Sequence, residues 1–148
     1  MIKYLQESTN VVKSRKRLSK LILIVAYLLI WAWLMILFWC FLDTGDEMGY
    51  GLLAFYIVLP VTTVIISFFI GKDDSWANWK WVMMLFFGIM YMMAGYATFS
   101  LANMISFGKI NEPDLATLIP GIICAAVGLA AGSIVNRISN RRKARKTS

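Results

Sequence analysis

The sequence contains no histidine and only two cysteines, Cys40 and Cys124. Histidine is the side chain that most often serves as a general base or a metal ligand near neutral pH. The two cysteines are far apart in sequence and form no CxxC dithiol, so we expect two free thiols. No paired nucleophile and base is visible either. We therefore predict a protein that is not an enzyme and that has no cofactor and no bound metal.

Charged residues are missing from four long stretches, residues 21–42, 48–71, 81–107 and 115–136. Each stretch reaches or exceeds the roughly 20 residues that a helix needs to cross a bilayer. Alternating segments of about ten residues, which are typical of a membrane β-barrel, are absent. The sequence predicts an all-α, multi-pass integral membrane protein: residues 1–148 form a single membrane domain, a four-transmembrane-helix bundle.

The absence of charge within these four spans also excludes several kinds of transport. Ionisable groups at depth mark ion pathways and proton relays, and this chain has none there. The small multidrug-resistance exporters also have four spans, but they depend on a glutamate within the first, which is missing here. These absences count against ion transport and proton coupling, but not against movement of a lipid.

Basic residues are distributed unevenly between the segments that connect the spans. Residues 1–20, the loop 72–80 and residues 137–148 hold fourteen of the fifteen lysines and arginines, and the other side has only Lys109. Basic short loops stay in the cytoplasm. We expect an N-in/C-in orientation, with a basic cytoplasmic segment at each end. Short outer loops and the lack of an N-x-S/T acceptor favour a bacterial plasma membrane.

The basic clusters are expected to contact anionic lipids of the inner leaflet, at about 1 kcal/mol per basic residue. Segment 1–20 is either a short amphipathic helix on the membrane surface or a disordered lead-in. No nucleic-acid-binding fold accompanies the clusters, so we expect no nucleic-acid partner. The candidate lipid contacts are Arg15, Lys16, Arg17, Arg141, Arg142 and Lys143.

Small residues at regular spacing predict close helix packing, because helices in lipid associate through small side chains. In the fourth span Gly128 and Gly132 form a GxxxG pair, and in the third span the spacing is seven. We predict that these two spans pack as an antiparallel hairpin, although a second copy of the chain is also a possible partner. The packing candidates are Gly88, Gly95, Ala102, Gly121, Ala125, Gly128 and Gly132.

Pro60 and Pro120 lie inside the second and fourth spans. Each removes a helical hydrogen bond and predicts a bend, which serves either packing or a broken-helix binding site. The stretch "NEPD" before the fourth span predicts a helix start with Asn111 as N-cap and Asp114 three positions later. Negative charge is favourable at such a position.

Polar aromatic residues lie within the spans, away from the interfaces that tryptophan and tyrosine prefer. Their hydroxyl and indole N–H groups need partners inside the bundle. They serve either core packing or a pocket for a lipid or another apolar molecule. The candidate pocket residues are Trp31, Trp33, Tyr56 and Tyr91.

Two functions remain. The first is a non-enzymatic accessory, assembly or regulatory subunit that acts through helix–helix contacts, with another membrane protein or a second copy of itself as partner. The alternative is a homo-oligomeric transporter, channel or flippase for an apolar or lipid-like molecule. Four helices are few for a pore, and the alternative therefore requires an oligomer.

Overall fold

The computed structural model describes the backbone of residues 2–41, 47–76 and 79–146 and the side chains of residues 18–40, 49–76 and 79–145. Within these ranges only Asp73 and residues 108–114 lie outside helices. The predicted all-α fold is confirmed. Four stretches are long and apolar enough to cross a membrane: Leu18–Cys40, Gly49–Lys72, Trp79–Phe107 and Leu115–Arg145.

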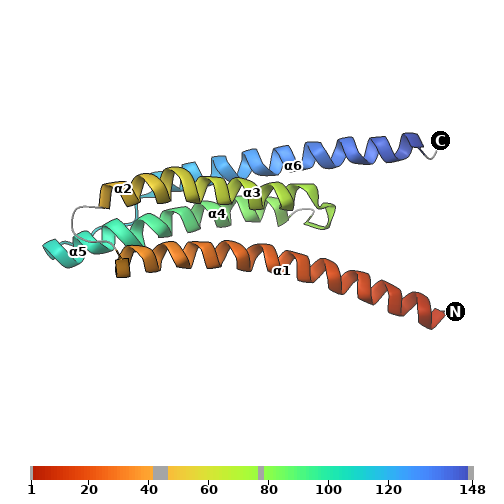
Figure 1. Cartoon of the computed structure of the whole chain (residues 1–148), viewed down its shortest axis with the longest axis horizontal. Helices are drawn as coiled ribbons and strands as arrows, with labels where there is room; N and C mark the ends of the chain where they lie inside the picture. Colours follow the sequence, from red (N-terminus) through yellow and green to blue (C-terminus); the bar gives the residue numbers. More distant parts are fainter. Residues whose placement is uncertain (1, 42–46, 77–78, 147–148) are drawn as a thin grey trace.

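These stretches lie roughly along one axis (Figure 1). In chain order the elements are α1 (Ile2–Phe41), α2 (Glu47–Gly51), η1 (Leu52–Val58), α3 (Leu59–Lys72), η2 (Asp74–Trp76), α4 (Trp79–Gly95), η3 (Tyr96–Ser100), α5 (Leu101–Phe107), η4 (Leu115–Thr117) and α6 (Leu118–Lys146). Of these, η1 and η3 are π-helical, whereas η2 and η4 are short 3₁₀ helices.

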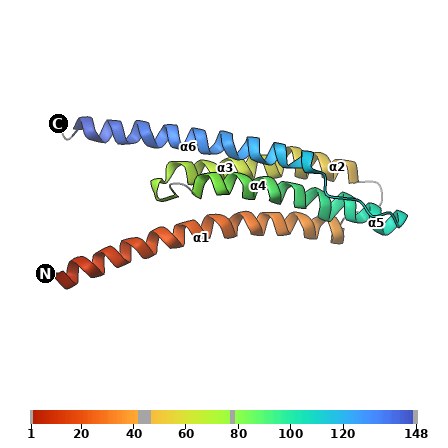
Figure 2. The same cartoon turned by 180° about the vertical axis from the view of Figure 1, so that it is seen from behind.

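Both chain termini lie at one end of the molecule, and α2 and α5 lie at the other (Figures 1 and 2). We refer to these as the termini end and the α2–α5 end. Helices α1 and α6 extend beyond the other helices at the termini end and diverge there (Figure 2). Residues 2–20 continue α1, so they form neither a separate helix nor an irregular lead-in. Likewise the basic residues after position 136 continue α6.

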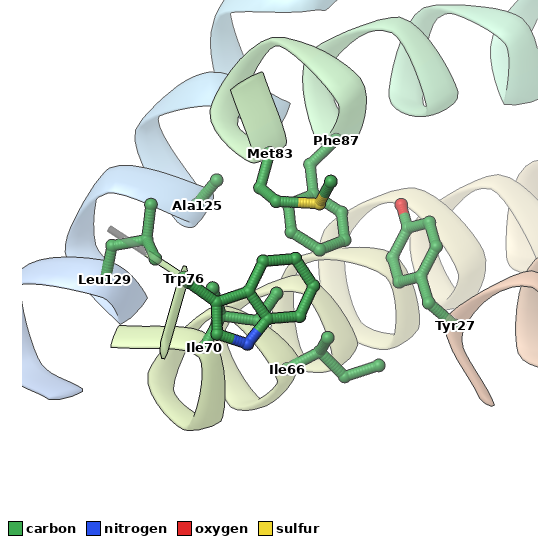
Figure 3. Packing of buried hydrophobic residues seen from close by; sticks show 8 residues of the cluster. All are labelled: Tyr27, Ile66, Ile70, Trp76, Met83, Phe87, Ala125 and Leu129. Carbon is green, nitrogen blue, oxygen red and sulfur yellow. The ribbon is translucent and has the colours of Figure 1, made fainter. Parts of the chain in front are cut away.

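The core consists of two clusters. The first lies toward the termini end, where Tyr27 of α1 packs edge-on against Phe87 of α4 with ring centroids 4.7 Å apart. Trp76 of η2 is buried against the same cluster (Figure 3). The second cluster lies toward the α2–α5 end and includes Phe38 and Tyr50. Many large apolar side chains of the four long stretches are exposed, among them Leu29, Trp33 and Trp81.

Helix α6 packs most extensively on α3, and glycines allow their backbones to approach closely. A Cβ atom at Gly128 would lie 2.5 Å from the Val64 carbonyl oxygen, and one at Gly132 would meet the Phe68 carbonyl oxygen. Gly71 of α3 faces the Leu129 carbonyl in the same way. The GxxxG pair therefore contacts the second span of the same chain, and not the third span as the sequence predicts.

The third and fourth spans do pack extensively as an antiparallel pair, but the predicted small residues of the two spans meet at only one position. A Cβ at Gly121 would lie 2.9 Å from the Gly88 Cα atom. Gly95 instead faces the ring of Phe55, and Ala102 packs against the second core cluster. The spacing of seven does not form one seam, because η3 follows Gly95 directly and a π-helical turn holds more residues than an α-helical turn. Ala125 is fully buried in the first cluster.

Candidate functional site

A pocket of about 560 Å³ lies toward the α2–α5 end, between the second, third and fourth spans. Tyr91 is buried at its base, whereas Tyr56 is 77% exposed and forms part of its rim. Both Pro60 and Pro120 line it. The other lining residues are Gly51, Phe55, Met92, Gly95, Tyr96, Phe99, Ser100, Asp114 and Thr117. A concave apolar surface with a few polar groups is typical of a small-molecule site.

The wall from the second span is shaped by a change of helical register. The Leu59 N–H donates to the Ala54 carbonyl, five residues back, and Pro60 has no N–H to donate. The Phe55 carbonyl therefore lacks the donor that either an α-helical or a π-helical register would supply. The Tyr91 hydroxyl of the third span donates to this carbonyl instead. Pro60 thus explains why the Phe55 carbonyl is available to accept the hydrogen bond from Tyr91.

The wall from the third span has a similar irregularity. In η3 the Leu101 N–H donates to the Tyr96 carbonyl, again five residues back. The Thr98 hydroxyl is fully buried and donates to the Ala94 carbonyl at 2.8 Å, so a side chain supplies a donor where the register changes. Such single π-helical turns within α-helices are frequent at functional sites. The two π-helical segments border the same pocket.

The wall from the fourth span begins at Asp114. Its Oδ1 atom accepts a hydrogen bond from the Ala116 N–H at 2.9 Å, which makes Asp114 the N-cap of η4. The Thr117 hydroxyl donates to the Asp114 carbonyl at 2.6 Å. The sequence prediction of Asn111 as N-cap is thus wrong, because residues 108–114 lie outside helices and the first helical turn starts at Leu115. Pro120 lies in the first turn of α6, where its missing N–H costs little.

Two of the four candidate pocket residues lie elsewhere. Trp31 is half-buried, and its indole N–H donates to the Met90 carbonyl at 3.0 Å. Trp39 makes the same kind of bond to the Ala97 carbonyl. Trp33 is 60% exposed on the outer face of α1. The prediction that Trp31 and Trp33 line the pocket is corrected, because α1 packs on other faces of the second and third spans and contributes no residue to the pocket lining.

Several site residues were missed by the sequence reasoning. Phe55 and Phe99 form the aromatic wall, with ring centroids 5.7 Å apart. They are ordinary apolar residues in sequence, so only the fold brings them together. Gly71 could have been predicted as a packing residue from the sequence. Ser67 and Gly71 are small residues four positions apart, which is the spacing typical of close helix packing.

The basic residues lie at the termini end. Arg137 and Arg141 line a polar pocket of about 380 Å³ beside Asp74, whose Oδ1 atom accepts a hydrogen bond from the Asn136 Nδ2 atom at 2.7 Å. Arg142 and Lys143 line a separate hollow of about 340 Å³ elsewhere on α6. The candidate lipid contacts Arg15, Lys16 and Arg17 lie outside the described side chains.

Comparison with protein-family models, with curated proteins and with solved structures finds no match to this chain.

Proposed function

We propose that this chain is a non-enzymatic, multi-pass protein of a bacterial plasma membrane that binds an apolar, lipid-like molecule in the pocket lined by Tyr56 and Tyr91. Four helices of span length and their exposed apolar side chains support membrane insertion. The basic termini lie together at one end, which supports an N-in/C-in orientation (Figure 1). In this orientation the termini end faces the cytoplasm, and the pocket opens toward the outer leaflet.

The observation that carries the proposal is the position of the pocket between three spans, where two helices leave the α-helical register. A change of register that served packing alone would be filled by side chains. Here it borders a hollow that an acyl chain or a similar apolar group can occupy. The small-residue contacts of Gly128 and Gly132 are used within the chain, so they offer no docking face to another protein.

Replacement of Gly95 by leucine tests the proposal. A Cβ at Gly95 meets only the Phe55 ring, at 3.8 Å, so the leucine side chain is directed into the pocket. The matched control is Gly49→Leu, where nothing lies within 4 Å of the added Cβ. We expect native mass spectrometry to show a bound lipid-like molecule on the wild type and on Gly49→Leu. Gly95→Leu, with an unchanged melting temperature, should lose it.

A folded Gly95→Leu protein that carries the same molecule would contradict the proposal. If Gly95→Leu does not fold, Tyr56→Ala serves as the second variant, because the Tyr56 side chain is largely exposed and its removal leaves no core cavity. Retention of the bound molecule by Tyr56→Ala at wild-type occupancy would contradict the proposal as well.

The accessory-subunit role is a second candidate, and Trp33 favours it. Two other tryptophans of α1 donate their indole N–H groups to carbonyls of the neighbouring span. The Trp33 N–H forms no hydrogen bond within the described residues, although Trp33 lies well inside a span-length helix. A helix of another protein could offer it a carbonyl. Trp33→Phe should then release a co-purifying chain in native mass spectrometry, whereas retention of that chain would argue against the role.

A further inference from the structure

The polar side chains of the pocket are neutral hydroxyl groups and one carboxylate. Among the residues whose side chains the structure describes, Asp114 is the only charged one that lines the pocket, and no lysine or arginine does so. One carboxylate oxygen accepts the Ala116 N–H, and Asp114 forms no ion pair with any residue whose side chain is described. The side chain is exposed at the mouth of the pocket. A ligand group placed there meets a carboxylate that still has hydrogen-bonding capacity.

The helix start at Asp114 does not favour an anion. The N-terminus of a helix carries partial positive charge, which usually attracts negative groups. Here the Asp114 carboxylate itself occupies that position through its bond to the Ala116 N–H. The nearby basic residue Lys109 does not line the pocket. The charged group that the described residues place at the mouth is therefore a carboxylate.

The rest of the pocket wall is rich in aromatic rings, whose faces attract cations. Phe55 is held by Tyr91 at a centroid distance of 6.0 Å and by Phe99 at 5.7 Å, so this part of the wall is packed in place. Tyr56 and Tyr96 add two further rings. A carboxylate beside aromatic rings is a combination suited to an ammonium group, and the walls toward Pro60 and Pro120 suit an alkyl chain.

We infer that the ligand is a cationic amphiphile, with an ammonium head held at Asp114 and the tyrosine rings and an apolar tail directed toward the two prolines. The inference rests on the proposed function of this pocket and specifies the chemistry of its ligand. An ammonium head can come from a lipid of the outer leaflet or from a soluble lipophilic ammonium compound.

Binding of three probes with the same alkyl chain tests the inference. The full-length protein in dodecyl maltoside is titrated with decyltrimethylammonium, decyl sulfate and the neutral decanol. The wild type should prefer the cationic probe. Asp114→Asn keeps a side chain that caps helices well, and it should weaken binding of the cationic probe about tenfold while leaving the neutral probe unchanged. The matched control, Glu112→Gln, removes one negative charge from the same loop outside the pocket and should bind like the wild type.

Equal affinity for the cationic and anionic probes, or an Asp114→Asn variant that binds the cationic probe like the wild type, would overturn the inference. If Asp114→Asn does not fold, Tyr56→Leu replaces a ring by an apolar chain and should weaken the cationic probe more than the neutral one. Equal weakening of both probes would also overturn it.

Two further arms separate the remaining outcomes. Competition by short-chain phosphatidylethanolamine would identify a lipid headgroup as the ammonium source, whereas its absence, with probe binding retained, would identify a soluble amphiphile.

Gly95→Leu separates a failure of this inference from a failure of the proposed function. If that variant binds all three probes like the wild type, the pocket is not the binding site and the proposed function fails. If only the charge preference is absent, the proposed function stands and the inference fails.

Discussion

Single glycines decide how closely the helices of this protein approach one another. Gly128 and Gly132 place α6 against backbone carbonyls of α3, and Gly71 does the same from the other side. A methyl group at such a position meets a backbone atom that cannot move without moving its helix. Glycine is required here for space and not for its backbone freedom, because all three residues are helical.

Gly132→Ala should therefore destabilise the protein. The added methyl meets the Phe68 carbonyl oxygen, and we expect a loss of about 1–3 kcal/mol in the free energy of unfolding, as for other overpacked cores. The measurement is an SDS titration in mixed micelles. Gly49→Ala is the control, because its Cβ has open space, and it should be neutral or slightly stabilising. Equal stability of the two variants would show that the α3–α6 contact is looser than described.

Lys20 is a second residue with a defined structural role. Its Nζ atom donates to the Ser75 carbonyl at 2.6 Å and lies 5.1 Å from the centre of the Trp76 ring. These contacts attach α1 to η2 at the termini end. Because α1 is otherwise packed less extensively than α3 and α6, this attachment matters for its position.

Lys20→Met should lower the free energy of unfolding by roughly 1 kcal/mol, since it removes one hydrogen bond and one cation–π contact. Lys72→Met removes a lysine from the same end and should have little effect, because Lys72 is exposed. Thermal unfolding of both variants in the same detergent makes the comparison. An equal shift for both would assign the effect to net charge and not to these contacts.

At the scale of the elements, the second span depends on the third. Pro60 and the π-helical register of η1 leave the Phe55 carbonyl without a backbone donor, and the Tyr91 hydroxyl supplies one. The two residues Tyr91 and Phe55 are 36 positions apart in sequence. The change of register in one span is thus stabilised by a side chain of another span.

Tyr91→Phe should cost about 1–2 kcal/mol of stability, because it leaves a half-buried carbonyl unpaired. Pro60→Ala restores an N–H that can reach the same carbonyl in the π-helical register. In the Pro60→Ala background the cost of Tyr91→Phe should be smaller, and a double-mutant cycle measures the difference. Additive effects in the cycle would mean that Pro60 and Tyr91 act independently.

For the whole molecule, the proposed orientation follows from the basic residues and from the shared position of the termini (Figure 1). A green fluorescent protein fused after Ser148 should fluoresce, as expected for a cytoplasmic terminus. In a variant with Cys40 and Cys124 replaced, Glu112→Cys should react with a membrane-impermeant maleimide in intact cells. Arg141→Cys should react only after permeabilisation. The reverse labelling pattern would invert the proposed orientation and place the pocket at the inner leaflet.

Much of the fold could be predicted from the composition of short sequence segments. Span length depends on the absence of charge over about 20 neighbouring residues, and the distribution of basic residues depends only on which segment holds them. The candidate site was partly predictable: Tyr56 and Tyr91 line the pocket, together with both prolines, because buried polar aromatics and irregular helices need special surroundings. Trp31 and Trp33 are also polar aromatic residues within a span, but they belong to α1, which contributes no residue to the pocket lining.

The sequence by itself thus determined the helical class, the number of span-length helices and the charge difference between the two ends. These properties need no knowledge of which residues touch. The tertiary structure alone decided that Gly128 and Gly132 contact the second span, that Phe55 and Phe99 share a wall, and that Asp114 lies at the pocket mouth. The physical reason is helical phase: two π-helical segments rotate the faces that follow them, and contacts between distant spans depend on that rotation.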